Sequence, residues 1–221
     1  MIKLLIFDCD LTVADSSYSI TENFNMIADT LGRPHVTHEK VMRDIALPLP
    51  QLFEAFIGEY RPEWRELYIK NTAIVEPKLM RPFPDTIPTL KRLREEGVRL
   101  AMASNREDPR PGMEWLGLAQ YFDAMAGGMG LSAPGVRGDP LPYKPDPAML
   151  NALLKHFGLP REHAAYVGDA EIDIETSRAA GMRGIGVTSG NVTAEGFKEL
   201  GAWRVIGALS ELPGIVAEEA S

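Results

Sequence analysis

The sequence predicts an α/β fold, with a Rossmann-like parallel sheet core and an all-helical domain inserted after the first strand. Three observations indicate it. The chain opens with a short, continuous apolar run at 4–7, which is typical of a strand buried on both faces. Residues from about 17 to 80 then carry apolar side chains at helical spacing, without a convincing strand. From about 86 onward, helical and strand patterns alternate, which favours a parallel sheet with right-handed crossovers.

Composition and charge limit the classes of protein that this chain can represent. Its 221 residues are enough for one large domain, or for a core with a smaller second domain. The formal net charge of -8 argues against a nucleic-acid partner, whose phosphates would be repelled. We expect no signal peptide and no membrane span, because few apolar residues precede Asp8 and no run approaches about 18 apolar residues. The single cysteine, Cys9, allows no intrachain disulfide and fits a reducing, cytoplasmic setting.

The first strand ends at two carboxylates. Asp8 and Asp10 follow the apolar run and stand two residues apart. In an extended chain these two side chains share a face, while Cys9 turns away from them. Two carboxylates this close repel each other, and a bound cation or a shared proton would relieve the repulsion. Because carboxylate oxygens are hard ligands, the pair predicts a site that suits Mg2+.

The helical segment divides into about four helices. Ser16 or Asp15 can cap the first helix, and Gly32 ends it. Further helices are expected to begin near 37, near 52 and near 62, and the proline-containing stretch 81–85 breaks the helical pattern. We therefore predict a helical domain at 14–80 and an α/β core made of 1–13 and 81–221.

The core elements alternate between helix and strand. The expected helices are 87–97, 112–116, 147–158, 172–180 and 194–200, and the expected strands are 98–103, 122–125, 164–167, 184–187 and 203–206. The stretch 127–143 carries several glycines and is expected to be an irregular surface excursion. Asp146 is expected to cap the helix that follows it, with Pro147 at the first helical position.

Polar residues recur where the predicted strands end. The two carboxylates follow the first strand, Ser104 follows the second, and Asp169 follows a later one. The carboxyl ends of parallel strands meet at one edge of a sheet, so we expect these side chains to lie close together. Lys144 closes the irregular stretch, and Asp173 lies one turn into the helix after Asp169. Carboxylates for a cation, with a hydroxyl and an ammonium for phosphoryl oxygens, are the groups that phosphoryl transfer requires.

Four motifs stand in order along the chain, each on a predicted strand end or loop: Asp8-Cys9-Asp10-Leu11-Thr12, Ser104, Lys144 within Lys-Pro-Asp-Pro, and Gly168-Asp169-Ala170-Glu171-Ile172-Asp173. With these motifs the sequence resembles the haloacid dehalogenase-like hydrolase superfamily, in its phosphoglycolate phosphatase-like branch. The resemblance covers nearly the whole chain. It implies that the inserted helical domain is a cap over the core.

The resemblance implies a Mg2+-dependent phosphatase acting on a small phosphorylated metabolite such as 2-phosphoglycolate. Asp8 would attack phosphorus and form an aspartyl-phosphate, and Asp10 would act as general acid and then as general base. The implied phosphate-binding residues are Thr12, Ser104, Asn105 and Lys144, and the implied metal-binding residues are Asp8, Asp10 (through its backbone carbonyl), Asp169 and Asp173. Arg43 of the cap is the candidate for the carboxylate of an acidic substrate, because Arg suits bidentate carboxylate binding.

The sequence also departs from the branch and leaves alternatives open. Leu11 stands where many members have Gly, so we expect a more crowded turn after the first strand. A dehalogenase is disfavoured because Asp10 is present. A phosphosugar mutase shares the core chemistry, although Ile20 stands about where β-phosphoglucomutases carry a His. A catalytically silent binding protein on the same fold is the other alternative, and the complete set of carboxylates argues against it. The sequence does not predict the oligomeric state.

Overall fold

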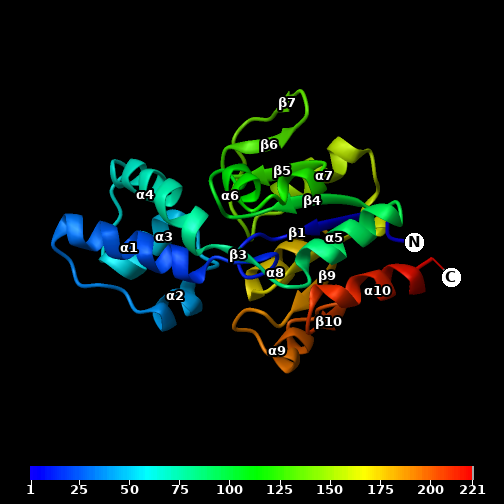
Figure 1. The fold of residues 1–221 in the computed structure, drawn as a ribbon. Helices are drawn as coiled ribbons and strands as arrows, with labels where there is room; N and C mark the ends of the chain where they lie inside the picture. The colour runs from blue at the N-terminus through cyan, green and yellow to red at the C-terminus, as the bar shows by residue number, and fades with distance from the viewer. Residues whose placement is uncertain (221) are drawn as a thin grey trace.

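A single large sheet organises the core. In the computed structural model, which describes residues 1–220, eight strands follow the order β10-β9-β8-β1-β4-β5-β6-β7 (Figure 1). The strands are β1 Leu4–Phe7, β4 Arg99–Ala103, β5 Ala124–Gly127, β6 Gly130–Ala133, β7 Val136–Arg137, β8 Ala164–Gly168, β9 Arg183–Val187 and β10 Arg204–Ile206. All neighbours from β10 to β5 pair in parallel, which confirms the predicted Rossmann-like core.

Helices cover both faces of this sheet. The core helices are α5 Thr86–Glu95, α6 Arg110–Trp115, α7 Ala148–Phe157, α8 Glu171–Ala179, α9 Ala194–Glu199 and α10 Leu212–Glu218. Leu5 and Phe7 of β1 share a hydrophobic cluster with residues of α5, α6 and α10, whereas Leu4 and Ile6 share one with residues of α7. All four side chains are fully buried, so β1 is covered on both faces, as its apolar run predicts. Among the described residues, no helix has the length and apolar character needed to cross a membrane.

The prediction for 127–143 was wrong for the first part of this stretch, up to 137, whereas 138–143 form no helix or strand. In place of an irregular excursion, β6 and β7 extend the sheet through antiparallel pairing. Gly130 has a φ of 103°, and a Cβ there would come within 2.3 Å of the Asp139 carbonyl oxygen. The glycine therefore permits a close approach of two backbone segments. Composition alone does not distinguish this use of glycine from a flexible loop.

Some element boundaries also differ from those predicted. The strand expected at 122–125 is β5, which begins two residues later. Pro147 precedes α7 and is not its first residue, and the Asp146 carboxylate accepts a hydrogen bond from the Ala148 N–H at 2.9 Å. Periodicity locates an element, but the hydrogen bonds at its ends decide the exact residue.

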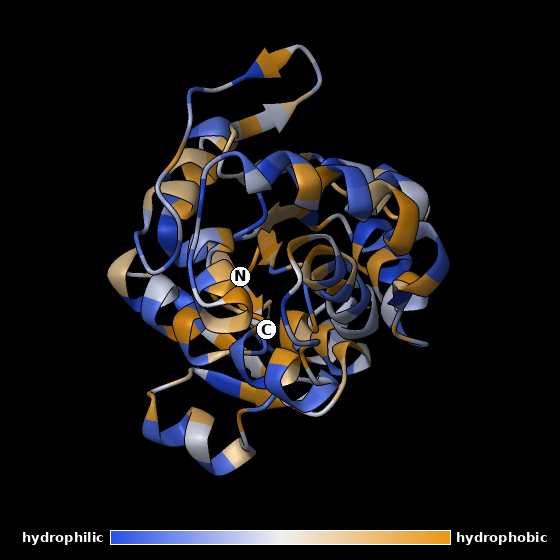
Figure 2. Cartoon of the chain, turned by 90° about the vertical axis from the view of Figure 1, so that its left-hand side faces the viewer, coloured by the Kyte–Doolittle hydropathy of each residue, from blue (hydrophilic) through white to orange (hydrophobic). Residues whose placement is uncertain are grey.

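The inserted segment is all helical. Its helices are α1 Ser17–Leu31, α2 His38–Asp44, α3 Leu49–Ile57 and α4 Trp64–Leu79, which stand to one side of the sheet (Figure 1). The ring of Phe24 packs against those of Phe53, Phe56 and Tyr68, at the centre of a separate hydrophobic cluster. Figure 2, viewed from this side, shows hydrophobic and hydrophilic residues mixed along each helix, as expected where one helix face is buried. The fold class is therefore confirmed, while the exact cap boundaries at 14–80 stay a prediction.

Two short strands join the cap to the core. β2, Ala14–Asp15, pairs antiparallel with β3, Arg81–Pro82. The chain therefore leaves the core and returns to it at neighbouring points. Two-residue strands carry no periodic pattern, so the sequence did not predict this ladder.

Leu11 connects the turn after β1 with the cap. It has a φ of 55°, yet its side chain is 2% exposed and belongs to the hydrophobic cluster of the cap, with Ile20 and Phe24. A left-handed backbone costs an L-residue roughly 1–2 kcal/mol. Burying a Leu side chain contributes roughly 1.5–3 kcal/mol. The burial offsets the strain, which explains why this position tolerates Leu.

We predict that Leu11→Ala destabilises the protein more than Leu11→Gly, by about 1 kcal/mol, because Ala loses the packing and keeps the backbone strain. Leu52 of α3 is a matched control, since it is buried in the same cluster but lies in a helix. There the order reverses, because Gly in a helix costs roughly 1 kcal/mol relative to Ala. Denaturant unfolding of the four variants measures both orders. If Gly destabilises the protein more than Ala at both positions, the proposed strain at Leu11 is refuted.

Candidate active site

The residues predicted to form the site converge at the carboxyl edge of the sheet. β1 lies between β4 and β8, and all three strands are parallel, so the segments that follow them meet. A small cleft at this edge is lined by core and cap residues: Asp8, Asp10, Ile45, Ala46, Ser104, Asn105, Lys144 and Asp169. Asp173 reaches the same place from the first turn of α8.

Three carboxylates lie close together at this edge. Asp8, Asp169 and Asp173 each offer an oxygen within 4.8 Å of the others, and all three are buried. Burial raises the pKa of Asp8 to about 7, although the Lys144 ammonium opposes the shift. Burial and the neighbouring carboxylates also raise the pKa of Asp169 well above its usual range. Carboxylates this close do not all remain ionised without a compensating cation.

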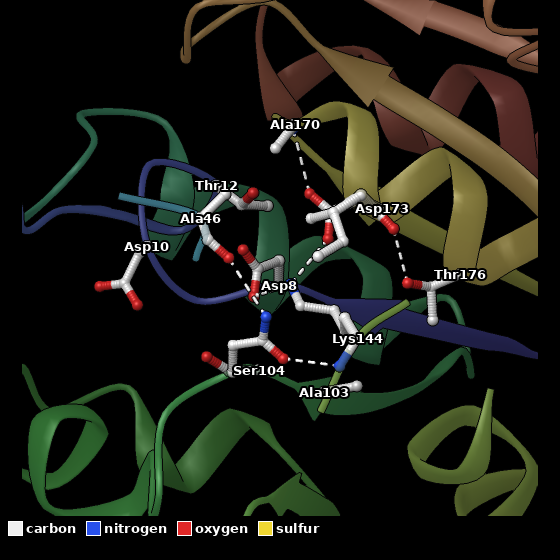
Figure 3. Close-up of polar contacts among 12 residues, drawn as sticks. Asp8, Asp10, Thr12, Ala46, Ala103, Ser104, Lys144, Ala170, Asp173 and Thr176 are labelled. Carbon is white, nitrogen blue, oxygen red and sulfur yellow. Dashed lines mark hydrogen bonds and ion pairs between the residues drawn. The ribbon is translucent and has the colours of Figure 1, made fainter. Parts of the chain in front are cut away.

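Lys144 supplies positive charge at the centre of this cluster (Figure 3). Its Nζ lies 2.9 Å from Asp8 Oδ1 and 2.7 Å from Asp173 Oδ1. Nζ also donates to the hydroxyl of Tyr166 at 3.2 Å, and that hydroxyl donates to Asp173 Oδ1 at 3.0 Å. Burial would lower the pKa of Lys144, but Asp173 and Asp8 outweigh it and raise the pKa well above its usual value. Asp173, which the resemblance assigns to the metal, also holds the lysine, together with Tyr166, which the sequence analysis missed.

The donor set fits a hard divalent cation. Among the described residues, the Lys144 ammonium is the only partner of Asp8 Oδ1. A Cβ at Gly190 would come within 2.2 Å of Asp169 Oδ2, and one at Gly168 within 2.2 Å of the Asp173 carboxyl carbon. Bare backbone at these two positions therefore makes room for the carboxylates. Oxygen ligands of this kind suit Mg2+, and Asp8, Asp169 and Asp173 are the side chains that would hold it.

Polar neighbours fix the positions of these groups. Thr12, expected at the phosphate, is fully buried and donates its hydroxyl to Asp169 Oδ1 at 2.8 Å. The side chain of Thr12 therefore orients a carboxylate. Asn105 joins two loops: its Oδ1 accepts the Lys144 N–H at 2.7 Å, and its Nδ2 donates to the carbonyl of Ala46 in the cap at 3.1 Å. The same amide thus positions the lysine and contacts the cap.

Asp10 points away from the other carboxylates (Figure 3). Its Oδ1 accepts hydrogen bonds from Ser16 Oγ at 2.5 Å and from Arg106 Nη2 at 2.6 Å, and its Oδ2 accepts one from Arg106 Nε at 2.9 Å. Burial alone would raise the pKa of Asp10, but the guanidinium outweighs burial and lowers the pKa below its usual value. The two carboxylates of the first motif therefore have opposite electrostatic environments.

Arg106 and Glu76 complete this second group, and the sequence analysis missed both. Arg106 bridges Asp10 of the core and Glu76 of α4, with 2.5 Å between Arg106 Nη1 and Glu76 Oε1. The backbone N–H of Arg106 also donates to Ser104 Oγ at 3.2 Å. Burial raises the pKa of Glu76 even though the guanidinium opposes it. The place of Arg106, two residues beyond Ser104 in a strand-end loop, was a usable signal, whereas nothing in the sequence marks Glu76 among the helical acids.

Arg43 lies in another cleft, which shares Ile45, Ala46 and Asp169 with the small cleft. This second cleft is formed by the α2–α3 turn and the segment after β8, and its core lining includes Asp169 and Glu171. The Arg43 side chain is 66% exposed and its Nε pairs with Asp44 Oδ1 at 3.2 Å. Its assignment to a substrate carboxylate stays a prediction.

Comparisons with known proteins agree with this arrangement. The family model for haloacid dehalogenase-like hydrolases matches residues 5–187. Phosphoglycolate phosphatase 1 of Pseudomonas aeruginosa is 30% identical over 205 residues, which cover 85% of this chain and 70% of that protein. The phosphoglycolate phosphatase of Rhodobacter capsulatus is 30% identical over 203 residues and is covered to 86%, as is this chain.

Solved structures share the whole architecture. A haloacid dehalogenase-like hydrolase from Bacteroides fragilis superposes with a TM-score of 0.84 at 29% identity, over 96% of this chain and 100% of that one. A predicted phosphoglycolate phosphatase from Haemophilus somnus, 21% identical, shares the fold with a TM-score of 0.83, over 97% of this chain and 98% of its own. The chain therefore belongs to the haloacid dehalogenase-like hydrolase family, in which it resembles the phosphoglycolate phosphatase-like branch.

Proposed function

We propose that this protein is a Mg2+-dependent phosphatase that hydrolyses a small phosphomonoester through an aspartyl-phosphate on Asp8. The observation that carries the proposal is the position of Asp8 at the end of β1. There its buried carboxylate lies beside Lys144 and shares a cluster with Asp169 and Asp173. A nucleophile, a cation for phosphoryl oxygens and a set of metal ligands thus meet in one cleft.

The reaction would proceed in two displacements. An Asp8 oxygen forms a bond to phosphorus while the bond to the leaving oxygen breaks, and Asp10 gives a proton to the leaving alkoxide. Because Arg106 lowers the pKa of Asp10, Asp10 would have to take up this proton when the substrate binds. Asp10 then takes a proton from a water that attacks the same phosphorus, which releases phosphate and restores Asp8. Lys144, Ser104 and the Asn105 backbone N–H would hold the phosphoryl oxygens. When bound, Mg2+ supplies positive charge that offsets the repulsion between the nucleophile and the phosphate.

The proposal extends to the substrate and setting. The names of these relatives support 2-phosphoglycolate or a similar small phosphorylated metabolite as the first substrates to test. Ile20, 4% exposed, has no group that could shuttle a proton, which favours hydrolysis over a mutase reaction. The single cysteine and the acidic net charge are consistent with a cytoplasmic enzyme that binds neither nucleic acid nor membrane.

We predict that Asp8→Asn abolishes phosphate release from phosphomonoesters, because the amide is nearly isosteric but a poor nucleophile. Asp10→Asn should lower kcat by about 10²–10⁴-fold, the usual loss when a general acid–base is removed. Asp139→Asn, at an exposed position of the core, is the control and should keep full activity. Steady-state phosphate release, together with circular dichroism to check folding, measures all three. Turnover by folded Asp8→Asn at the rate of the unmutated protein would refute the assignment.

A second prediction concerns pH and metal. The pKa of Asp8 is about 7 in the folded protein against 3.8 when unfolded, so the folded state binds more protons between these values. Without metal, the free energy of unfolding should therefore fall as pH rises from about 4 through about 7. Added Mg2+ should stabilise the protein, more at about pH 8 than at about pH 5, because it binds the ionised carboxylates.

Thermal unfolding with Mg2+ or with EDTA at the two pH values measures this effect, and EDTA should also stop turnover. The Asp8→Asn variant is the control, since it should lose much of the Mg2+ effect. Equal stabilisation by Mg2+ at both pH values, or in both proteins, would contradict a metal site at Asp8.

A further inference from the structure

A third, larger cavity adjoins the small cleft that contains Asp8. Its volume is about 370 Å³, and it lies between helices α1, α3 and α4 of the cap and the segment after β4 of the core. Asp10 lines both this cavity and the small cleft. Because Asp10 is proposed to protonate the leaving oxygen, the cavity is where the leaving group would extend. Its volume is that of a small-molecule site, roughly 300–1,000 Å³.

One side of this cavity and its mouth are lined by apolar side chains. Ile20 and Leu52 of the cap line it and are buried. At its mouth, Ile69 of α4, Trp115 at the end of α6, and Met129 before β6 are 46%, 40% and 56% exposed. A single exposed apolar side chain needs no explanation, but three from separate elements around one opening mark a binding surface.

The charges in the cavity leave no cation for a second anionic group. The charged side chains that line it are Asp10, Arg65, Glu76, Arg106, Glu107 and Asp108. Both guanidiniums are already paired with carboxylates of this set: Arg65 with Glu107 at 3.0 Å, and Arg106 with Asp10 and Glu76. Four carboxylates face these two guanidiniums, and Arg110, just outside the lining, pairs with Asp108, so the lining still carries a small acidic excess. A carboxylate or second phosphate on the leaving group would be desolvated here without a free partner among the described lining residues.

We propose that the leaving group of the physiological substrate is uncharged and has an apolar body of several carbon atoms that fills this cavity. The inference rests on the proposed phosphatase function and narrows its substrate class. The leaving group of 2-phosphoglycolate has only two carbons, one of them in a carboxylate, so it uses neither the volume nor the apolar lining, and it meets the acidic charge.

The test is a series of alkyl phosphates. Ethyl, butyl and hexyl phosphate share the phosphoryl group and a similar alkoxide, and they differ only in apolar length. Each methylene buried in the cavity should raise kcat/KM by roughly fourfold, from about 0.8 kcal/mol per CH2. Hexyl phosphate has four methylenes more than ethyl phosphate, so the expected result is a rise of up to about 250-fold when all four are buried, with 2-phosphoglycolate below hexyl phosphate.

Two exposed residues of α4 provide matched variants. Ile69 lines the cavity mouth, whereas Ile74, 41% exposed on the same helix, does not. Ile69→Ser should lower the ratio of kcat/KM for hexyl over ethyl phosphate, and Ile74→Ser should leave that ratio unchanged. Equal effects of the two substitutions on the ratio would overturn the assignment of the cavity.

The outcomes separate this inference from the proposed function. If alkyl phosphates are hydrolysed in an Asp8-dependent way but kcat/KM is flat from ethyl to hexyl, or 2-phosphoglycolate is preferred to hexyl phosphate, the leaving-group assignment is wrong and the phosphatase stands. If no phosphomonoester is hydrolysed, the proposed function fails, and the inference fails with it.

Discussion

The repulsion among carboxylates buried at the end of β1 is the constraint on which the site depends. Asp8, Asp169 and Asp173 lie close enough together to share one cation, in a buried place where water screens their charges little. Lys144 compensates part of this charge, and contacts from two other segments hold it in place. Tyr166 supports its ammonium, and Asn105 holds its backbone. A bound cation would compensate the rest. Charge balance therefore explains why residues from four separate segments must meet.

A second ionic group connects the chemistry to the cap. Arg106 contacts Asp10 in the core and Glu76 in α4, and all three side chains are largely buried. Removing one member of such a group leaves a buried charge without its partner, which is costly. The protonation of Asp10 is thus sensitive to the position of a cap helix, through one guanidinium. The family motifs do not include this contact, because it joins a core loop to a helix of the insertion.

The sequence predicts the fold and the carboxylate cluster at the edge of the sheet, and it fails where single contacts decide. The apolar run of β1 and the four ordered motifs were sufficient for the sheet and the carboxylate cluster. The β6–β7 hairpin was missed, because glycines that allow close backbone approach resemble glycines of a loop. The hydrogen bond from the Thr12 hydroxyl to Asp169 was also not predicted, and the phosphate-binding role of Thr12 stays a prediction. Glu76 lies thirty positions from its partner Arg106, and only the folded chain brings the two together.

The β2–β3 ladder has a consequence for exchanging the cap by protein engineering. Its pairing puts both ends of the inserted helices at one spot on the core, held by a few backbone contacts. Segments whose ends are adjacent can be exchanged without stretching the host chain. The helical unit is therefore a transplantable module: a graft that keeps Ala14–Asp15 and Arg81–Pro82 would inherit the phosphoryl chemistry of the core. The graft would also have to replace the partners that Leu11 and Arg106 find in the present cap.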